Sequence, residues 1–356
     1  MNLSDLGWGP FFAQHFEPFR NQGLEPARVA LEHKTVYTVC GERGELSAAV
    51  AGRLRFEAPS RGSLPAVGDW VAIEPPLHEG QARIQAVLPR KSAFVRKVAG
   101  AETQEQVVVA NVDTVFLVSG LDGELNPRRI ERYLAVAWES GATPVVLLNK
   151  ADVAEDAAAS VADLESIAPG VPALPLSAVS GVGLDALAPY LAAGRTVAFL
   201  GSSGVGKSTL INALLGAPRQ EVQAVREDDR RGRHTTTRRE LILLPGGALV
   251  IDTPGMRELQ LWEGDDALQD TFGDVEELAA RCRFRDCAHQ NEPGCAIREA
   301  IESGALDAGR LRSYLKLQRE LDHLARRKDH KGRLAEKAKW KKIAIQIKAL
   351  PRTKRL

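Results

Sequence analysis

A glycine-rich stretch stands past the middle of this 356-residue chain: Gly201-Ser202-Ser203-Gly204-Val205-Gly206-Lys207-Ser208. It matches the pattern G-x-x-x-x-G-K-[ST] in full, and Thr209 follows it. The stretch leaves an apolar, strand-like segment and enters a helical one, the context in which backbone N–H groups curl around phosphate oxygens. We predict that Lys207 neutralises the β- and γ-phosphates and that the Ser208 hydroxyl binds Mg²⁺. A glycine-serine turn that matches by accident is the weaker alternative, because both flanks are right.

A second motif indicates which base is bound. Asn149, Lys150 and Asp152 form an N-K-x-D motif at the end of an apolar segment. The Asp152 carboxylate can accept hydrogen bonds from guanine N1–H and the exocyclic amine together, and adenine has no such pair of donors. Asn149 is expected to fix the loop and Lys150 to cover the ring. Ser177 and Ala178 match the S-A-x element, whose backbone N–H would meet guanine O6. The tetrapeptide alone could arise by chance, but its position and this companion favour guanine.

The remaining nucleotide motifs follow the phosphate loop. Asp252 and Gly255 frame the sequence D-T-P-G, where the carboxylate is expected to hold Mg²⁺ through water and the Gly255 N–H to sense the γ-phosphate. A polar loop precedes them, and its spacing favours Thr236 or Thr237 as the switch-I ligand of Mg²⁺. A solvated loop without a ligand is the alternative for these threonines.

The order of these motifs along the chain is unusual. In most small GTPases the phosphate loop comes first, whereas here the base-reading motifs precede it. The same fold can be built if the usual termini are joined through residues 181–193 and new ends open elsewhere. Such a circular permutation places switch II directly before the C-terminal region, so a nucleotide-dependent movement could pull on that region.

Three regions are expected from the sequence pattern. Residues 1–98 contain short strand-like segments, which favour an N-terminal OB-type β-barrel, although a packing module without a ligand is equally compatible. Residues 99–265 alternate strands and helices and predict a central circularly permuted P-loop GTPase domain of α/β class. In it, residues 107–118 are predicted to form one long buried strand, and a helix is predicted from an Asn126 cap to Ser140. Residues 266–356 are expected to form a C-terminal zinc-binding domain with basic helices.

The metal prediction rests on four residues with the spacing C-x4-C-x-H-x5-C: Cys282, Cys287, His289 and Cys295. Three thiolates and one imidazole form the donor set of a closed, tetrahedral structural zinc site. The alternative is that these side chains pack as small core residues. Cys40 stands apart in a strand-like segment and is expected to be a core residue.

Charge and hydropathy indicate which partners and which cellular location to expect. The net charge is only +1, but residues 321–356 hold thirteen Lys or Arg against three acidic residues. Such a run is often just a solvated face, yet beside a possible barrel and a zinc knuckle it favours RNA. No apolar run reaches the ~20 residues that cross a bilayer, and the N-terminus lacks the layout of a signal peptide. We therefore expect a cytoplasmic protein, with no membrane partner, that acts as a monomer.

Taken together, the motifs resemble the bacterial ribosome small subunit-dependent GTPase A family. The resemblance rests on N-K-A-D, S-A, G-S-S-G-V-G-K-S, H-T-T-T and D-T-P-G in this order, followed by the cysteine-histidine cluster, and it covers residues 28–319. The segment V-G-D-W-V resembles the OB domain of that family. The resemblance implies a factor that acts late in maturation of the 30S ribosomal subunit, binds 16S rRNA and is stimulated by the small subunit to hydrolyse GTP to GDP.

The residue after D-T-P-G, Met256, is expected to limit the rate of GTP hydrolysis by the protein alone. Many GTPases carry a water-orienting glutamine there, but this chain has Met256, which cannot orient water by hydrogen bonding. We expect slow intrinsic turnover, with the missing group supplied by His234 or by the ribosomal partner; a solvent-exposed loop histidine is the alternative. Two other classes stay open: a GTPase of translation or tRNA modification, and an RNA-holding protein with a vestigial GTPase.

Overall fold

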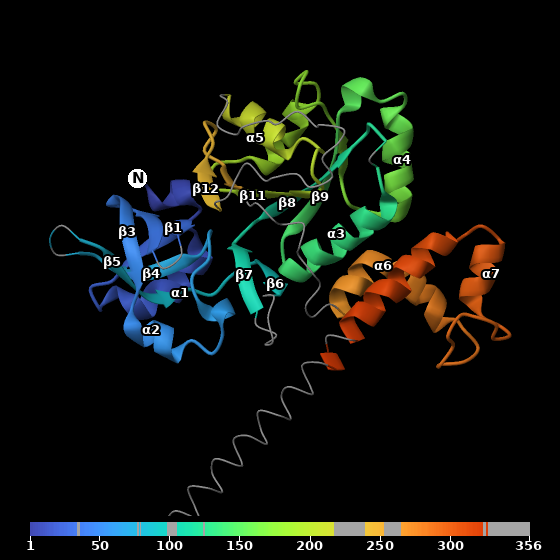
Figure 1. Cartoon of the computed structure of the whole chain (residues 1–356), viewed down its shortest axis with the longest axis horizontal. Coiled ribbons are helices and arrows are strands. Elements are labelled where there is room, and N and C mark those ends of the chain that lie inside the picture. The colour runs from blue at the N-terminus through green and yellow to red at the C-terminus, as the bar shows by residue number, and fades with distance from the viewer. Residues whose placement is uncertain are drawn as a thin grey trace, which may run out of the picture.

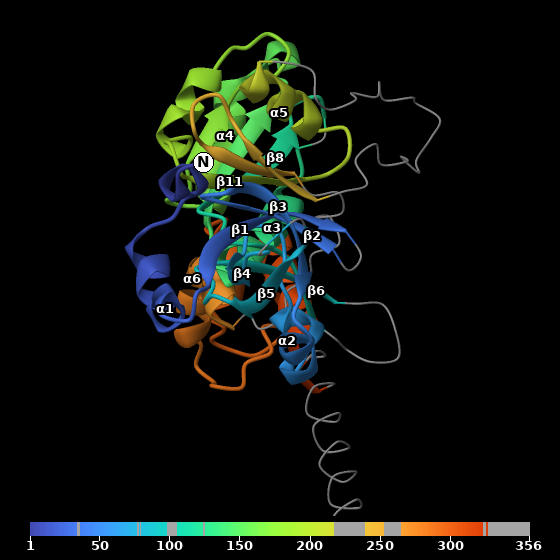
Figure 2. The same ribbon diagram turned by 90° about the vertical axis from the view of Figure 1, so that its left-hand side faces the viewer.

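The computed structural model describes residues 1–33, 36–76, 78, 80–97, 105–123, 125–216, 239–252, 265–322 and 325–326. A β-barrel, an α/β domain and a group of C-terminal helices lie side by side (Figure 1). The second view shows the barrel in front of and below the α/β domain (Figure 2). Within these residues, no helix combines the length and the apolar character that a bilayer crossing demands.

Five strands near the N-terminus form the barrel: β1 (Glu25–His33), β2 (Val36–Gly41), β3 (Gly44–Val50), β4 (Trp70–Glu74) and β5 (Ala82–Val87). They pair in the order β1-β2-β3-β5-β4, and β4 returns to β1 to close the barrel. The β3–β5 pair is parallel and the other four pairs are antiparallel. The predicted OB-type barrel is thereby confirmed. Two helices accompany the strands, α1 (Pro10–Arg20) before β1 and α2 (Gly52–Glu57) after β3, together with the 3-10 turns η1 (Leu3–Leu6) and η2 (Arg61–Ser63).

The apolar run 107–118 is divided between two strands, so the prediction of one long strand is wrong. β7 (Glu105–Ala110) pairs with β6 (Ala93–Lys97) in a separate two-stranded ribbon, and β8 (Thr114–Gly120) joins the main sheet. Asn111 breaks the run because its φ of 57° is left-handed, a conformation that asparagine tolerates better than the neighbouring valines. The predicted domain boundary after residue 98 lies between the two strands of this ribbon.

The α/β domain is built on six strands in the order β10-β9-β8-β11-β13-β12. Besides β8 they are β9 (Thr143–Asn149), β10 (Ala173–Pro175), β11 (Thr196–Gly201), β12 (Glu240–Leu243) and β13 (Leu249–Asp252). All neighbours are parallel except the hairpin β12–β13. One further pairing, Leu31 with Glu240, joins this sheet to the barrel.

Helices cover both faces of the sheet, as expected of a doubly wound domain. α3 (Pro127–Ser140) and α4 (Ala157–Ile167) share a core with Val115 and Leu117 of β8, whereas α5 (Lys207–Leu215) and the 3-10 helix η4 (Leu184–Tyr190) pack against Phe116 and Val118. A short turn, η3 (Ala151–Val153), follows β9.

The α3 helix has the predicted ends. The Asn126 side chain accepts a hydrogen bond from the Arg129 N–H at 3.1 Å, and Gly141 closes the helix with a φ of 81°. A Cβ on Gly141 would lie 3.1 Å from the Lys91 carbonyl oxygen, so both the conformation and the close approach favour glycine.

The C-terminal part of the described chain is helical. α6 (Asp265–Ala280), α7 (Ala296–Glu302) and a helical segment over residues 308–322 follow one another. α6 is kinked at Phe272, whose φ of −124° is not helical. These helices pack on α3 of the α/β domain, and Figure 1 shows the contact beneath that helix.

Candidate functional site

The phosphate loop connects the end of β11 to the first turn of α5. The Lys207 ammonium folds back over the loop and donates to the carbonyl oxygens of Gly201 at 2.9 Å and Ser202 at 2.5 Å. Gly206 has a φ of 93°, and a Cβ there would lie 2.2 Å from the Asn149 amide nitrogen. A Cβ on Gly201 would lie 2.4 Å from the Val118 carbonyl oxygen. Two glycines of the motif are therefore required by the packing of this loop as well as by its curvature.

Asn149 connects the three motifs that the sequence singled out. It ends β9, is buried, and donates through Nδ2 to the Val205 carbonyl oxygen of the phosphate loop at 2.8 Å. Its Oδ1 accepts the backbone N–H of Ala178 at 3.0 Å. Ser177 is also buried, and its hydroxyl accepts the Ser180 N–H. The structure thus brings the predicted base-reading residues and the phosphate loop together, although the Ala178 N–H expected to meet guanine O6 is engaged by Asn149.

The other two residues of the N-K-x-D motif point away from the core. Lys150 has a left-handed φ of 66° and forms an ion pair with Asp122 of the loop after β8. Asp152 lies in η3 and is exposed, which leaves its carboxylate open to a ligand. The sequence did not single out Asp122, because nothing in the pattern around it marks a partner for Lys150.

A further contact with the phosphate loop was also missed. The Arg129 guanidinium, in the first turn of α3, donates to the Ser202 hydroxyl at 2.8 Å. Seventy-three residues separate the two positions, so only the fold brings them together. α3 therefore contacts the phosphate loop at its N-terminal end.

The magnesium side of the predicted site is described in part. Ser208 and Thr209 lie in the first turn of α5, where the helix N-terminus favours anions. Asp252 is the last residue of β13, which pairs with β11, so it lies at the same edge of the sheet as the phosphate loop. Four predicted residues lie outside the described residues: His234, Thr236, Thr237 and Gly255.

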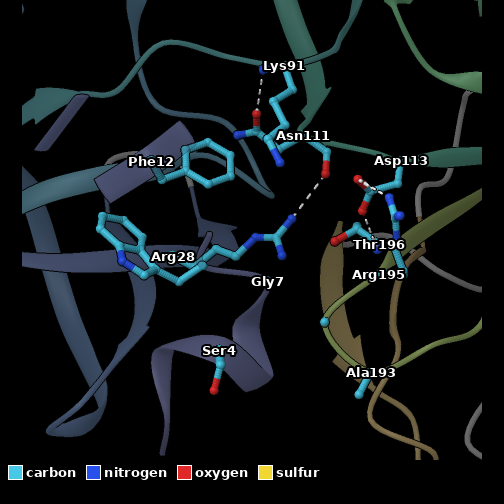
Figure 3. Close-up of a pocket in the computed structure, with 12 residues that line it drawn as sticks. Ser4, Gly7, Phe12, Arg28, Lys91, Asn111, Asp113, Ala193, Arg195 and Thr196 are labelled. Atoms are coloured by element: carbon cyan, nitrogen blue, oxygen red, sulfur yellow. Dashed lines mark hydrogen bonds and ion pairs between the residues drawn. The ribbon is translucent and has the colours of Figure 1, made fainter. Parts of the chain in front are cut away.

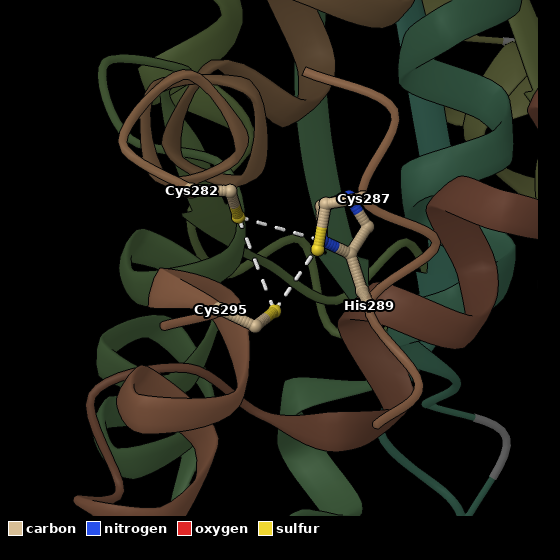
Figure 4. Close-up of side chains that lie close together, drawn as sticks. All are labelled: Cys282, Cys287, His289 and Cys295. Carbon is tan, nitrogen blue, oxygen red and sulfur yellow. Dashed lines mark hydrogen bonds between the residues drawn. The ribbon is translucent and has the colours of Figure 1, made fainter. Parts of the chain in front are cut away.

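The four predicted metal ligands converge in the C-terminal region (Figure 4). Their ligand atoms all lie within 4.8 Å of one another. The His289 Nδ1 is 3.6 Å from the Cys282 Sγ and 3.5 Å from the Cys295 Sγ, and these two sulfurs are 3.9 Å apart. A tetrahedral zinc ion with ordinary bond lengths would require about 3.6 Å and about 3.8 Å for these separations. The cluster therefore has the dimensions to hold one zinc ion.

The local backbone prepares this cluster. Cys295 is the N-cap of α7 and is buried, while His289 adopts a left-handed φ of 59°. The Glu292 carboxylate accepts the N–H groups of residues 288, 290 and 291. Its own backbone N–H contributes most to lowering its pKa, and these three bonds lower it further. The loop that carries His289 is thus held by a side chain outside the ligand set.

Protonation of the thiols is uneven within the cluster. Burial opposes ionisation of Cys282, but the N–H groups of Ile297 and Ala296 and the neighbouring thiols lower its pKa. Desolvation and the competing thiols raise the pKa of Cys287 to about 11. A cation at the centre would remove this competition, because bound metal replaces the thiol protons.

The strand order now defines the class of this protein. The strands β12 and β13 follow the phosphate-loop strand β11 in the sequence, whereas β8, β9 and β10, which bear the base motifs, precede it. All six strands nevertheless belong to one sheet. The protein is therefore a P-loop nucleotide-binding protein with a circularly permuted sheet, as the motif order predicted.

Comparison with known proteins identifies the family. The sequence profile of the RsgA GTPase matches residues 87–262. A small ribosomal subunit biogenesis GTPase RsgA from Opitutus terrae is 54% identical over 352 residues, with 96% of each chain covered. The protein of the same name from Syntrophotalea carbinolica is 47% identical over 356 residues and covers 98% of this chain and 97% of its own. The chain belongs to the RsgA GTPase family and is a GTP hydrolase.

Solved structures agree with this assignment. The crystal structure of YjeQ from Thermotoga maritima is 30% identical, with a TM-score of 0.60, and covers 84% of this chain and 98% of that one. YloQ, described as a circularly permuted GTPase, has a TM-score of 0.58 at 22% identity and covers 85% of this chain and 97% of its own. The YloQ likeness shows that the fold is shared.

Proposed function

We propose that this protein is a GTP-driven assembly factor that acts in late maturation of the 30S ribosomal subunit. The observation that carries the proposal is the near full-length match to relatives named for small ribosomal subunit biogenesis, at 54% and 47% identity. The partners proposed are the small subunit, through its 16S rRNA, and GTP or GDP. Assembly of this subunit places the proposed activity in the cytoplasm, and we propose that the protein acts there as a monomer.

The proposed nucleotide site uses the residues gathered at the carboxyl ends of β9, β11 and β13. Lys207 exchanges its two carbonyl partners for the β- and γ-phosphates when GTP enters, because a charged acceptor binds an ammonium more strongly than a carbonyl does. Ser208 holds Mg²⁺ directly and Asp252 through water. Asp152 reads the guanine edge, since its exposed carboxylate faces outward from η3.

Turnover is proposed to depend on the partner. The residues assigned to the switch are Thr236 or Thr237 as a magnesium ligand, the Gly255 N–H as the γ-phosphate sensor, and His234 as a group that orients water. Met256 cannot replace a water-orienting glutamine. We therefore propose a slow intrinsic reaction that the small subunit accelerates.

Zinc is proposed as a structural ion of the C-terminal domain. The donor set of three cysteines and one histidine fits Zn²⁺, and four protein ligands leave no open position for a substrate. When bound, the ion would cross-link the loop between α6 and α7. RNA binding is proposed for the barrel and for the basic residues of positions 321–356, which include thirteen Lys or Arg and three acidic residues and lie mostly outside the described residues.

The decisive experiment compares GTP turnover with and without purified small subunits. Wild-type protein is expected to be accelerated by small subunits and not by large subunits or tRNA. Lys207→Ala should reduce stimulated turnover by on the order of 10²-fold or more, because it removes the main cation at the transferred phosphate. Arg20→Ala is the matched control, since Arg20 is exposed on α1 and pairs there with Glu17.

Three results would contradict the proposal. Acceleration by tRNA alone would indicate a GTPase of translation or tRNA modification. An absence of turnover under every stimulus would indicate a vestigial GTPase. Full activity of Lys207→Ala would remove the phosphate loop from the reaction. In the same assay, an unchanged stimulated rate for His234→Ala would exclude that histidine from the mechanism.

A further inference from the structure

A cavity of about 310 Å³ lies where three parts of the chain meet (Figure 3). The N-terminal segment contributes Trp8 and Phe12, and the barrel contributes Arg28. The loops before β6, β8 and β11 contribute the remaining walls, with Lys91, Asp113 and Arg195 among them. None of these residues belongs to the nucleotide motifs or to the cysteine-histidine cluster.

A buried guanidinium forms part of the cavity wall. Arg28 is 1% exposed and donates to three carbonyl oxygens, those of Leu6 at 2.5 Å, Gly68 at 3.2 Å and Asn111 at 3.2 Å. These bonds use three of its five N–H groups, and within the described chain no carboxylate lies at ion-pair distance. Burial lowers the pKa of Arg28 to about 10, against the opposing effect of Asp113 and Asp69, so the group stays charged at neutral pH.

The two carboxylates nearest to Arg28 already have other partners. Asp69 is fully buried and accepts two hydrogen bonds from Arg90, at 2.8 and 2.7 Å. Asp113 accepts the Thr196 N–H at 2.8 Å and pairs with Arg195 at 3.4 Å. These carboxylates therefore act on Arg28 only at longer range, and its guanidinium carbon lies 5.8 Å from the centre of the Trp70 ring.

Lys91 is a further positive charge in the cavity lining. The Lys91 ammonium lies 4.9 Å from the centre of the Phe12 ring and 5.7 Å from that of Phe11, and it has no carboxylate partner among the described residues. The cavity lining thus presents Arg28, Lys91 and Arg195 against the single carboxylate of Asp113. Lys91 and Arg195 are exposed, whereas Arg28 is buried. A buried positive charge without a counter-ion is costly, and a bound anion removes that cost.

We propose that this cavity binds a small oxyanion, a phosphate or carboxylate group carried by a small molecule. The oxyanion would accept the unused N–H groups of Arg28 and the ammonium of Lys91, and the Trp8 and Phe12 rings would cover a compact apolar portion of the ligand. The volume lies at the lower end of the range of roughly 300–1,000 Å³ seen for small-molecule pockets.

The position of the cavity separates it from the nucleotide site. Asp113 and Thr196 stand at the start of β8 and β11, whereas the phosphate loop begins at Gly201, where β11 ends. Five residues of extended strand span about 16 Å. A ligand in the cavity would touch the N-terminal segment, the barrel and the GTPase domain at once, so it would stabilise their relative placement.

The test measures binding of inorganic phosphate to the full chain by equilibrium dialysis, with GDP and Mg²⁺ saturating and ionic strength held constant with chloride. One phosphate per chain is expected to bind saturably. Lys91→Gln should raise its Kd by about tenfold, as expected for a lost charge-assisted contact, and Arg195→Gln should also raise it, because it removes a positive charge from the cavity lining. Trp8 lies in the cavity wall, so its fluorescence should titrate with the same Kd. Acetate in place of phosphate distinguishes a carboxylate site from a phosphate site.

Matched variants keep the result interpretable. Arg53→Gln removes an exposed arginine that pairs with Glu57 on α2, and it should leave the Kd unchanged. Arg28→Lys should raise the Kd for phosphate more than the variants at the exposed residues Lys91 and Arg195 do. If Arg28→Lys fails to fold, Lys91→Gln and Arg195→Gln are sufficient to test the proposal. An unchanged Kd in both of these variants, or a linear isotherm for both anions, would overturn the proposal, because phosphate would then bind nonspecifically. Binding that disappears in Lys207→Ala would also overturn it, because phosphate would then be held by the phosphate loop.

Discussion

At the scale of single residues, Asn149 shows how one side chain can serve binding and folding together. Its amide bridges the phosphate loop and the S-A-x loop with two hydrogen bonds, of 2.8 and 3.0 Å. Because the group is buried, loss of either partner would leave an unpaired polar atom, which costs about 1–3 kcal/mol. We propose that the exposed neighbour Asp152 provides the specificity for guanine, and its substitution should leave this bridge intact.

The substitution Asp152→Asn should exchange the preferred base. An asparagine amide would lose the paired acceptance of guanine N1–H and the exocyclic amine, and its NH₂ group would instead face the 2-oxo group of xanthine. We expect the Kd for GDP to rise by on the order of 10²-fold and the Kd for xanthosine diphosphate to fall below it. Competition between the two fluorescent-labelled nucleotides measures this ratio. Asp156→Asn, in the exposed N-cap of α4, is the matched control and should keep guanine preference; the same preference in Asp152→Asn would show that another residue reads the base.

At the scale of elements, the loop between α6 and α7 carries the cysteine-histidine cluster. α7 has only seven residues, and an isolated helix of that length is not stable in water. Ile297 and Ala300 are its buried residues, and we expect a metal cross-link to contribute the rest of the local order.

Metal removal should therefore unfold this region and leave the nucleotide domain intact. One zinc ion per chain is expected by elemental analysis, and a chelator should remove it together with part of the helical circular dichroism signal. Cys295→Ser should bind less than one zinc ion, whereas Cys40→Ser should keep it, because Cys40 is buried in the barrel strand β2. GDP affinity is expected to persist after chelation. A protein that contains no zinc and resists the chelator would exclude a structural metal.

At the scale of the whole molecule, Arg310 joins the C-terminal helices to the GTPase domain. The residue is 5% exposed, and all five N–H groups of its guanidinium donate hydrogen bonds. Two go to the Asp274 carboxylate, both at 2.7 Å, and one goes to Glu131 at 3.1 Å. The other two go to the carbonyl oxygens of Ile167 and Thr271. Glu131 belongs to α3, the helix whose Arg129 contacts the phosphate loop. α3 thus contacts the nucleotide site and the C-terminal helices within one helical turn.

The variant Arg310→Met should uncouple these two parts. It removes one of the two arginines that pair with the buried Glu131, while Arg128 stays at 2.7 Å, and it also removes both bonds to Asp274. Breaking a buried pair costs roughly 3–5 kcal/mol, and the remaining Arg128 places the expected loss at the lower end of that range. Urea unfolding is expected to show that loss, with earlier hydrogen exchange in α6 than in the sheet. Arg298→Met removes an exposed pair with Glu302 and should change stability by less than about 1 kcal/mol. Equal effects of the two variants would show that Arg310 does not join the domains.

The elements that the sequence predicted best have their signals within a few neighbouring residues. The α3 helix begins and ends where the asparagine cap and the terminal glycine predict, since capping is a local interaction. The strand at 107–118 was predicted wrongly because its apolar pattern is continuous, while the break at Asn111 depends on partners such as Gly68, forty-three residues away. Asp122, Arg129 and Arg28 were missed for the same reason, because each acts through a distant backbone or side chain.

The sequence by itself determined the chemistry of this protein: a phosphate loop, a guanine-reading motif, a permuted order and a zinc-like donor set. The phosphate loop, the base motif and the donor set follow from residue types at short, fixed spacing, and the permuted order is read directly along the chain. Only the tertiary structure decided how the barrel, the GTPase domain and the C-terminal helices meet, where Arg28 and Arg310 are buried. The reason is physical, because burial and long-range pairing depend on which surfaces pack together, and no local pattern specifies that.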